Sequence, residues 1–268
     1  AYPERFFDCG IAECNMVGVA AGLATCGKIP FAASFAMFSA GRAFEQVRNS
    51  VGYPKLNVKI VGSHAGISVG EDGATHQCCE DIALMRAIPG MTVVVPADAA
   101  QTAAAVRAIA NVDGPAYIRI CRNNLEDLTD PDAPFVIGKP TVMRDGSDIA
   151  VYACGATLSM ALKAAEMLKD KISVRVVNVA TLKPIDDAAL IAAAGPCRGI
   201  VTAEEHSVIG GLGSAVAQAL ALECKPIGFV GIEDKYGTSA HTYDELLDYY
   251  GITAGHIAEK VEAIYKRV

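Results

Sequence analysis

Residues 57–77 read N-V-K-I-V-G-S-H-A-G-I-S-V-G-E-D-G-A-T-H-Q, an apolar run of strand length followed by a polar loop rich in glycine and histidine. We expect a buried strand at 57–62 that ends where this loop begins. In open α/β sheets, ligands bind in the crevice outside the carboxyl ends of the parallel strands. The stretch therefore predicts both a fold class and the position of a functional site.

Apolar runs of strand length alternate with helix-length segments on both sides of this stretch, which is the pattern of parallel sheets covered by helices. In the first half we expect strands at 5–9, 29–35, 57–62, 91–96 and 115–121, and helices at 11–26, 37–52, 75–88 and 98–111. In the second half we expect strands at 148–154, 173–179, 199–203 and 226–232, a helix ending near residue 170, and helices at 186–194, 211–223 and 256–267. The sequence predicts an α/β fold made of two three-layer α/β/α domains with mostly parallel sheets.

A stretch rich in aspartate and proline, L-E-D-L-T-D-P-D-A-P-F-V-I-G (125–138), interrupts the alternation. Such composition is typical of a linker between domains. We therefore divide the chain into a first domain at 1–125, a linker at 126–137 and a second domain at 138–268.

Composition excludes several classes of protein. The chain has 268 residues, of which 52% are hydrophobic, and 30 acidic against 23 basic side chains give a net charge of -7. The high hydrophobic content excludes a disordered chain, and the net negative charge argues against a nucleic-acid-binding protein. Between Cys14 and Gly41 only Lys28 is charged, but Gly27 and Pro30 split this run, so we favour a buried core over a membrane span.

The nine cysteines form no C-x-x-C pair. An odd number without the spacing of a disulfide framework indicates a reducing compartment, and we expect a cytoplasmic protein. Free cysteines are usually small core residues, so we expect most of them to be buried and a zinc site to be absent.

The loop at 63–77 is the densest polar cluster in the chain. We expect Thr75 to cap a helix that begins at His76, which would direct the imidazole and free backbone N–H groups at one cavity. A divalent-metal site built from His64, Asp72 and His76 is a second interpretation. A merely solvated loop is the third.

Glu13 is the only charged residue between Asp8 and Lys28, in a segment that is otherwise largely apolar. A carboxylate in such surroundings is costly to ionise unless it has a partner. It could exchange a proton with a ligand nitrogen, or simply be stabilised by the helix dipole in a first turn. Phe35 and Phe38 flank a strand-to-helix junction, where their rings either project into a crevice or only pack in the core.

Two further clusters could bind anions. Arg119 and Arg122 lie at the end of an expected strand and suit a phosphate group, although a plain surface role is equally compatible. In the second half, Glu204-Glu205-His206 precedes a glycine-rich turn at 210–213 that opens a helix. Its glycines lack dinucleotide spacing, so we favour a tight loop that seats the helix over a phosphate cradle.

Several segments, taken together, resemble the C-terminal half of a transketolase, and most of all the separate C-terminal subunit of split transketolases. These segments are F-F-D-C-G-I-A-E-C-N-M (6–16), F-A-M-F-S-A-G-R-A-F-E-Q-V-R (35–48), G-E-D-G-A-T-H-Q (70–77), R-A-I-P-G-M-T-V-V-V-P-A-D-A (86–99) and A-E-E-H-S-V-I-G-G-L-G-S (203–214). The resemblance implies a pyrimidine-binding domain followed by the family's C-terminal domain. It also implies transfer of a two-carbon ketol unit from a ketose phosphate to an aldose phosphate with thiamine diphosphate.

The resemblance also assigns roles to residues. Glu13 would hydrogen-bond the aminopyrimidine ring of the cofactor and favour its imino tautomer, and Phe35 and Phe38 would stack around that ring. With Glu13, His64 and His76 are the implied catalytic residues. The implied substrate-binding residues are His64, Asp72, His76 and Arg122.

The family's pattern for magnesium and the cofactor diphosphate, G-D-G followed by a distant asparagine, does not occur in this sequence. We therefore expect Mg²⁺ and the diphosphate to be held by an N-terminal partner subunit, without which the chain is inactive, and we also expect a homodimer contact. The family's first domain normally begins with a further helix and strand, so we expect residues before Ala1 to be missing. Two alternatives remain: a 1-deoxyxylulose-5-phosphate synthase-like enzyme, and a non-catalytic assembly subunit.

Overall fold

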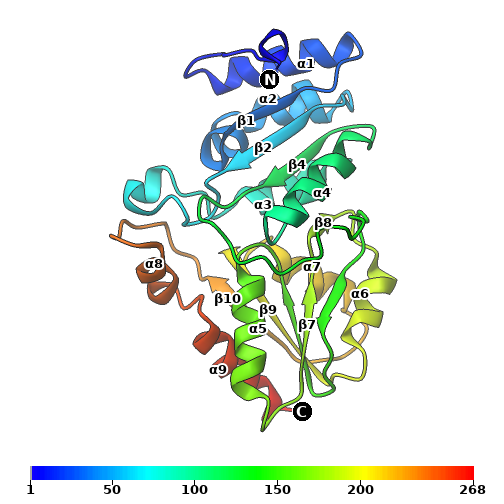
Figure 1. The fold of residues 1–268 in the computed structure, drawn as a ribbon, viewed down its shortest axis with the longest axis vertical. Coiled ribbons are helices and arrows are strands. Elements are labelled where there is room, and N and C mark those ends of the chain that lie inside the picture. The colour runs from blue at the N-terminus through cyan, green and yellow to red at the C-terminus, as the bar shows by residue number, and fades with distance from the viewer. Residues whose placement is uncertain (1) are drawn as a thin grey trace.

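The computed structural model describes residues 2–268 and contains two five-stranded sheets, one above the other along the long axis of the molecule (Figure 1). The strand orders are β1-β2-β4-β3-β8 and β10-β9-β6-β7-β5. Within each sheet every strand pair is parallel except the one at a single edge, β3 with β8 and β5 with β7. The predicted α/β class with mostly parallel sheets is confirmed.

The first sheet is built almost entirely from the first half of the chain. Its strands are β1 (Phe31–Phe35), β2 (Lys59–Ser63), β3 (Thr92–Val94), β4 (Ala116–Arg119) and β8 (Thr181–Lys183). Its helices are α1 (Glu13–Thr25), α2 (Phe44–Gln46), α3 (Asp81–Ala87) and α4 (Ala99–Ala110), and α2 lies between the π-helical turns Met37–Arg42 and Val47–Gly52. Alternate residues of β3 divide its faces: Val93 packs in the core with α1 and α3, and Val94 packs against α4.

The second sheet follows the same logic. Its strands are β5 (Thr141–Arg144), β6 (Ile149–Ala153), β7 (Val174–Asn178), β9 (Gly199–Ser207) and β10 (Ile227–Ile232). Its helices are α5 (Thr157–Leu168), α6 (Asp187–Ala194), α7 (Leu212–Ala219), α8 (Tyr243–Tyr249) and α9 (Ala254–Tyr265). Every residue of β6 is buried, because Ile149 and Val151 face α5 and α9 while Ala150 and Tyr152 face α6 and α7.

The two halves of the chain share one hydrophobic core. Tyr117 and Val95 of the first half pack in the same cluster as Tyr152 and Leu182 of the second. Strand β8, from the second half, also extends the first sheet by pairing with β3. The two halves of the chain therefore pack closely against each other. The division of the chain at 126–137 stays a prediction.

The structure corrects several predicted elements. The expected strand at 5–9 is a 3-10 turn at Pro3–Arg5 followed by irregular chain with exposed Phe6 and Phe7, because within residues 2–268 no strand pairs with it. The expected helix at 75–88 begins only at Asp81. The edge strands β5 and β8 and helix α8 were not predicted, since short edge strands carry little periodic signal.

The cysteines are less buried than expected. Cys78, Cys79, Cys154 and Cys197 lie in the core, but Cys14, Cys26 and Cys224 are exposed. Across residues 2–268, every helix falls short of the length and apolar character that a membrane crossing requires.

Candidate active site

The residues singled out in the first half converge on one edge of the first sheet, because the parallel strands β1, β2 and β4 all end there. Phe35 is the last residue of β1, His64 follows the last residue of β2, and Arg122 lies three residues beyond the end of β4. In Figure 1 this edge lies on the left of the upper sheet, beside the loop that precedes α3. The predicted placement at the carboxyl ends of parallel strands is confirmed.

Glu13 is the first residue of α1 and is only 8% exposed. Its carboxylate accepts from Ser34 Oγ at 3.5 Å and pairs with Arg42 Nη1 at 3.4 Å. Both contacts are long for hydrogen bonds to a carboxylate, so its oxygens retain acceptor capacity for a further donor. The N-terminal end of the helix stabilises the negative charge.

Two phenylalanines and two histidines form a continuous aromatic surface beside Glu13. The Phe35 and Phe38 rings are 6.2 Å apart and within 13° of parallel. The His64 ring stacks on Phe35 at 4.0 Å, and the His76 ring meets Phe38 edge-on at 5.2 Å. All four side chains are half-buried, so part of each ring stays accessible. We call these four residues together with Glu13 the strand-end cluster.

Asp72 and Arg122 lie next to this cluster. His64 has a lowered pKa, first because of burial and second because of the Arg122 charge, while Asp72 acts in the opposite direction. A lowered pKa keeps its imidazole neutral near pH 7, as proton transfer requires. The structure thus brings all seven predicted site residues to one edge, although their roles stay predictions.

Arg122 is tied to the loop that carries His64. Its side chain donates to Val69 O at 3.0 Å and pairs with Glu71 at 3.5 Å, and its backbone N–H donates to Ser68 Oγ. A pocket of about 330 Å³ opens beside it, lined by Ser68, Gly70, Glu71, Arg122, Asn123, His241 and Tyr243. Half of the Arg122 side chain is exposed, so its guanidinium can contact an anion in this pocket.

One expectation about the loop is wrong, and one alternative interpretation of it is contradicted. Thr75 does not cap a helix starting at His76, because Gly70–Thr75 forms a 3-10 helix in which Gly73 has a φ of 71°, and the chain turns away before α3. His76 nevertheless reaches the site through its contact with Phe38. In the described part of the chain, no group of three or more His, Cys, Asp or Glu side chains is placed to hold a metal ion, so the alternative metal site is not formed.

Arg119 is neither a phosphate ligand nor a surface residue. It is 6% exposed, and its Nε donates to Asp81 at 2.9 Å and its Nη2 to the backbone carbonyl of Glu205 at 2.7 Å. Tyr117 also donates to Asp81, at 2.7 Å. Together with Glu204 and His206, these residues form a buried network between the halves of the chain. We call Asp81, Arg119, Glu204, Glu205 and His206 the buried network.

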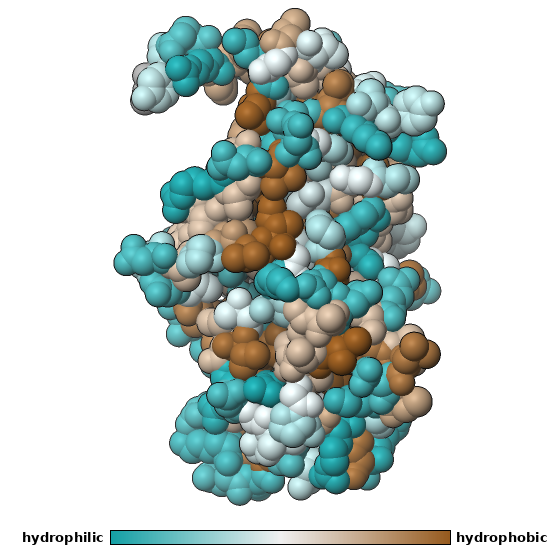
Figure 2. All heavy atoms as spheres, turned by 90° about the vertical axis from the view of Figure 1, so that its right-hand side faces the viewer, coloured by the Kyte–Doolittle hydropathy of each residue, from teal (hydrophilic) through white to brown (hydrophobic). Residues whose placement is uncertain are grey.

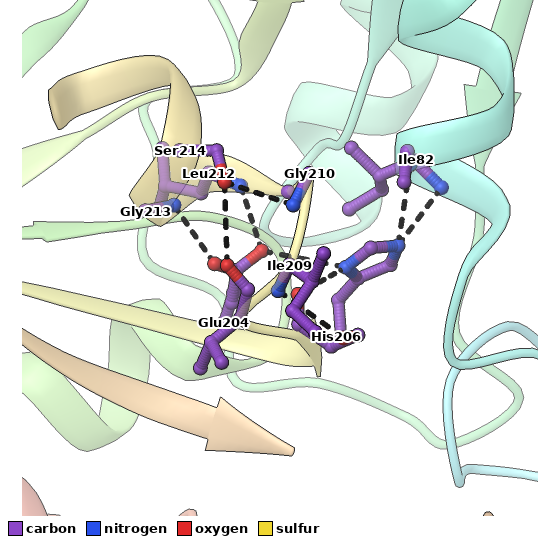
Figure 3. A network of polar contacts seen from close by, with 12 residues as sticks. Ile82, Glu204, His206, Ile209, Gly210, Leu212, Gly213 and Ser214 are labelled. Atoms are coloured by element: carbon purple, nitrogen blue, oxygen red, sulfur yellow. Dashed lines mark hydrogen bonds and ion pairs between the residues drawn. The ribbon is translucent and has the colours of Figure 1, made fainter. Parts of the chain in front are cut away.

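Glu204 occupies the position that a phosphate would take at the glycine-rich turn. Its two carboxylate oxygens accept from the backbone N–H groups of Leu212 and Gly213, at 2.7 and 2.8 Å, at the start of α7 (Figure 3). The anion-binding end of the helix is therefore already neutralised by the protein. The structural interpretation of this turn, a tight loop that seats a helix, is confirmed. Burial raises the pKa of Glu204 to about 7.

His206 joins the second half to α3. Its Nε2 accepts from the backbone N–H groups of Ile82 and Ala83, at 3.1 and 3.4 Å, at the first turn of that helix (Figure 3). Only the neutral ring can accept there, and burial lowers the pKa of His206 to about 4. At the other end of α3, Lys183 Nζ donates to the carbonyls of Arg86 and Ile88. Both ends of α3 are thus held by the second half.

Sequence reasoning missed Arg42. It pairs with Glu13, and its guanidinium lies 4.8 Å from the centre of the Phe38 ring. A signal was present, because Arg42 is the only charged residue between Lys28 and Glu45. An isolated charge in an apolar stretch generally needs a partner, and the only acid in the preceding apolar stretch is Glu13.

The strand-end cluster fits a flat, partly apolar heterocycle that carries hydrogen-bond donors. Phe35 and Phe38 offer ring faces, and Glu13 offers a buried acceptor with only long contacts of its own. The aminopyrimidine ring of thiamine diphosphate has this chemistry. Arg42 and Arg122, which lie at the cluster, each already have an acidic partner.

Comparison with known proteins agrees with this chemistry. The family description "Transketolase, pyrimidine binding domain" matches residues 1–127, and "Transketolase, C-terminal domain" matches residues 138–257. The chain is 50% identical to the "putative transketolase C-terminal section" of Methanocaldococcus jannaschii, over 97% of this chain and 83% of that one. It is 44% identical to the "6-deoxy-6-sulfo-D-fructose transketolase subunit SqwH" of a Clostridium species, over 99% of this chain and 83% of that one.

A solved structure shares the whole arrangement. The "split gene transketolase, inactive beta4 tetramer" superposes with a TM-score of 0.90 at 50% identity, covering 99% of this chain and 85% of that one. Sequence, fold and the chemistry of the strand-end cluster therefore agree. The chain belongs to the transketolase family of thiamine-diphosphate-dependent transferases and corresponds to the family's C-terminal section, a pyrimidine-binding domain followed by the C-terminal domain.

Proposed function

We propose that this chain is the C-terminal subunit of a split transketolase and moves a two-carbon ketol unit from a ketose phosphate to an aldose phosphate. One observation carries the proposal: the buried Glu13 carboxylate lies at the same sheet edge as two aromatic rings and two histidines. Its contacts are long enough to leave room for a donor from a bound ring. When bound, thiamine diphosphate supplies the nucleophilic carbon and the electron sink.

Glu13 is the residue that handles the proton on the cofactor ring. A carboxylate in a site with little water forms a strong hydrogen bond to a ring nitrogen and favours the tautomer that it bonds. Phe35 and Phe38 hold the ring in place by stacking, and Arg42 orients the Glu13 carboxylate through their ion pair.

The histidines and Arg122 face the sugar. A histidine imidazole can accept a proton from a substrate hydroxyl and return it, and His64 and His76 are both half-buried at the edge where the sugar would lie. Asp72 is close enough to influence His64 and suits a hydroxyl of the donor. Arg122 suits the terminal phosphate. The Clostridium relative is named for a sulfonated sugar, and a sulfonate group is also an anion.

We further propose that the chain works only with an N-terminal subunit that holds Mg²⁺ and the cofactor diphosphate. The magnesium pattern of the family does not occur in the sequence. Apolar side chains also reach the surface of the first half, where Figure 2 shows an irregular hydrophobic band on the upper part of the molecule. The exposed large apolar residues of this half include Phe6, Phe7, Ile11, Ile29 and Phe31. Such a surface supports contact with a partner subunit and with a second copy of the chain.

Replacing Glu13 by glutamine tests the proposal. In the complex reconstituted with the N-terminal subunit, we expect Glu13→Gln to lower kcat by about 10²–10⁴-fold, because an amide cannot take or hold the proton. The unfolding curve of the isolated chain should stay close to wild type. Glu166→Gln, a surface change on α5, is the matched control and should leave kcat within about twofold.

A near-normal kcat in Glu13→Gln would contradict the role of Glu13. The same assay separates the alternatives. Turnover with pyruvate in place of the ketose phosphate would point to a deoxyxylulose-phosphate synthase. An assembled complex that binds cofactor and is not affected by any change in this chain would point to a non-catalytic subunit.

A further inference from the structure

Strand β9 carries two adjacent buried glutamates that point in opposite directions. Glu204 is fully buried and turns toward α7, where it accepts from Leu212 and Gly213. Glu205 is 2% exposed and turns toward the first half of the chain. Successive side chains of a strand face opposite sides, so the two carboxylates serve different parts of the molecule.

Glu205 grips the loop that carries the site histidines. Its Oε1 accepts from the backbone N–H of Ile67 at 2.8 Å, and its Oε2 accepts from the Tyr243 hydroxyl at 2.7 Å. The loop approaches so closely that a Cβ at Gly66 would lie 2.4 Å from Glu205 Oε1. This contact joins residues that are 138 positions apart in the sequence.

The loop segment bonded by Glu205 contains one predicted substrate residue, His64, and contacts another, Arg122. His64 lies three positions before Ile67 and has a φ of 53°, a left-handed conformation that is unfavourable for a residue with a side chain. Ser68 and Val69 follow Ile67 directly and hold the backbone and the side chain of Arg122. A shift at Ile67 therefore moves the anchors on both sides of the substrate position.

We propose that Glu205 is a positioning residue through which the C-terminal half sets the loop carrying His64 and the anchors of Arg122, and thereby the binding of the sugar phosphate. The inference rests on the proposed function for its effect on substrate. The contact itself belongs to the isolated chain and can be tested there. The length of the Glu205 side chain is what matters for this role, because its oxygen must lie within hydrogen-bond distance of the Ile67 N–H.

Two conservative variants distinguish the effect of side-chain length from the effect of side-chain charge. Glu205→Gln keeps the length of the side chain, an oxygen for Ile67 N–H and a donor for Tyr243, but removes the charge. Glu205→Asp keeps the charge but shortens the side chain by one methylene, so it cannot reach both partners. A positioning role predicts that glutamine is tolerated and aspartate is not. A purely electrostatic role predicts the reverse.

In the reconstituted complex, we expect Glu205→Asp to raise KM for the sugar phosphate about tenfold or more, since small displacements of positioning groups are costly. The affinity for thiamine diphosphate should change less than about twofold, because Glu13, Phe35 and Phe38 lie on other elements. Glu205→Gln should keep KM within about threefold of wild type.

Glu204 supplies the matched control, because it is equally buried, adjacent and bonded to two backbone N–H groups. Glu204→Asp should destabilise the chain by loosening α7 and still leave KM for the sugar within about twofold. If Glu204→Asp raises KM as much as Glu205→Asp, general destabilisation explains both effects and the proposal fails.

Hydrogen exchange on the isolated chain gives a readout that needs neither partner nor activity. Glu205→Asp should increase exchange at the amides of residues 65–69, and Glu204→Asp should do so at residues 211–214. Unchanged exchange at 65–69 in Glu205→Asp would overturn the positioning role. An inactive wild-type complex with the expected exchange pattern would instead refute the proposed function alone.

If Glu205→Asp fails to fold, Tyr243→Phe tests the same grip with a smaller change. It removes only the partner of Oε2 and leaves the carboxylate free to move away from Ile67. We expect increased exchange at 65–69 and a KM about two- to fivefold higher. Wild-type exchange and KM in that variant would overturn the proposal.

Discussion

The strand-end cluster and the buried network both concentrate ionisable side chains in an apolar setting, yet they differ in how completely their polar groups are bonded. In the cluster, the contacts of Glu13 are 3.4 to 3.5 Å long and the rings are half-buried. In the network, Arg119 and Glu205 make contacts of 2.7 to 2.9 Å and are almost fully buried.

The difference separates a site that is prepared for a ligand from one whose bonds are already made. Loosely bonded acceptors and exposed ring faces leave capacity for a cofactor and a sugar. Short bonds between buried groups leave none, and removing one partner leaves the other uncompensated. Except at Glu205, which also holds the histidine loop, changes in the network should therefore affect stability first, and changes in the cluster should affect binding and turnover first.

The largest effect on stability is expected where the network loses a charge. Arg119→Met leaves Asp81 buried without its cation and should lower the free energy of unfolding by about 3–5 kcal/mol. Arg122→Met removes an arginine of the same strand end that is half exposed, and should change stability by less than about 0.5 kcal/mol. Chemical denaturation of both variants measures the contrast. Equal losses would remove the distinction between the two regions.

A smaller effect concerns pH. The pKa of His206 falls to about 4 from its ordinary 6.5, so its contribution to stability is complete above pH 6.5 and is lost as the pH falls toward 4. The pKa of Glu204 rises to about 7 from 4.5, so its contribution is complete below pH 4.5 and is lost as the pH rises toward 7. The two dependences oppose each other in the wild type.

Glu204→Gln removes one of these two dependences. Because the Glu204 dependence is lost, the free energy of unfolding of this variant should rise by about 2–3 kcal/mol more than that of the wild type between pH 4 and 6.5. Urea unfolding across that range measures the slope. Parallel curves for wild type and variant would contradict the raised pKa of Glu204.

The smallest effect is expected at the edge of the cluster. Arg42→Gln removes the partner of Glu13, but the arginine side chain is 55% exposed and its contact is long. We expect cofactor affinity in the reconstituted complex to fall by about three- to tenfold, with an unchanged unfolding curve. Arg107→Gln, on the exposed face of α4, is the control for loss of a surface arginine. A stability loss without a change in affinity would place Arg42 with the network instead.

Much of the fold was predictable because burial in a parallel sheet leaves a local trace. The fully buried run of β6 and the alternation of strands with helices both appear in the order of residues. The strand-end cluster was also predictable, because parallel strands end at one edge and the resemblance assigned roles to residues on three such ends. The predicted secondary structure was wrong where the sequence has no helical or strand periodicity of hydrophobic residues. These places are the irregular chain of residues 6–10, the loop before α3 and the edge strand β8.

Partners far apart in the chain could not be predicted. Arg119 and Arg122 look equivalent in sequence, but one turns inward to Asp81 and the other stays at the surface. Glu204 and Glu205 are neighbours of the same type, but successive side chains of β9 point to opposite sides. Glu204 therefore contacts the start of α7, and Glu205 contacts Ile67.

The amino-acid sequence by itself determined the α/β class, the family and the edge at which the functional groups gather, because each of these depends on local patterns of burial and on the order of short segments. Only the tertiary structure decided that Arg119 turns inward to Asp81, that β8 joins the first sheet and that Glu205 holds the histidine loop. Those contacts depend on which distant surfaces meet when the shared core forms, and the sequence around each residue carries no record of its partner.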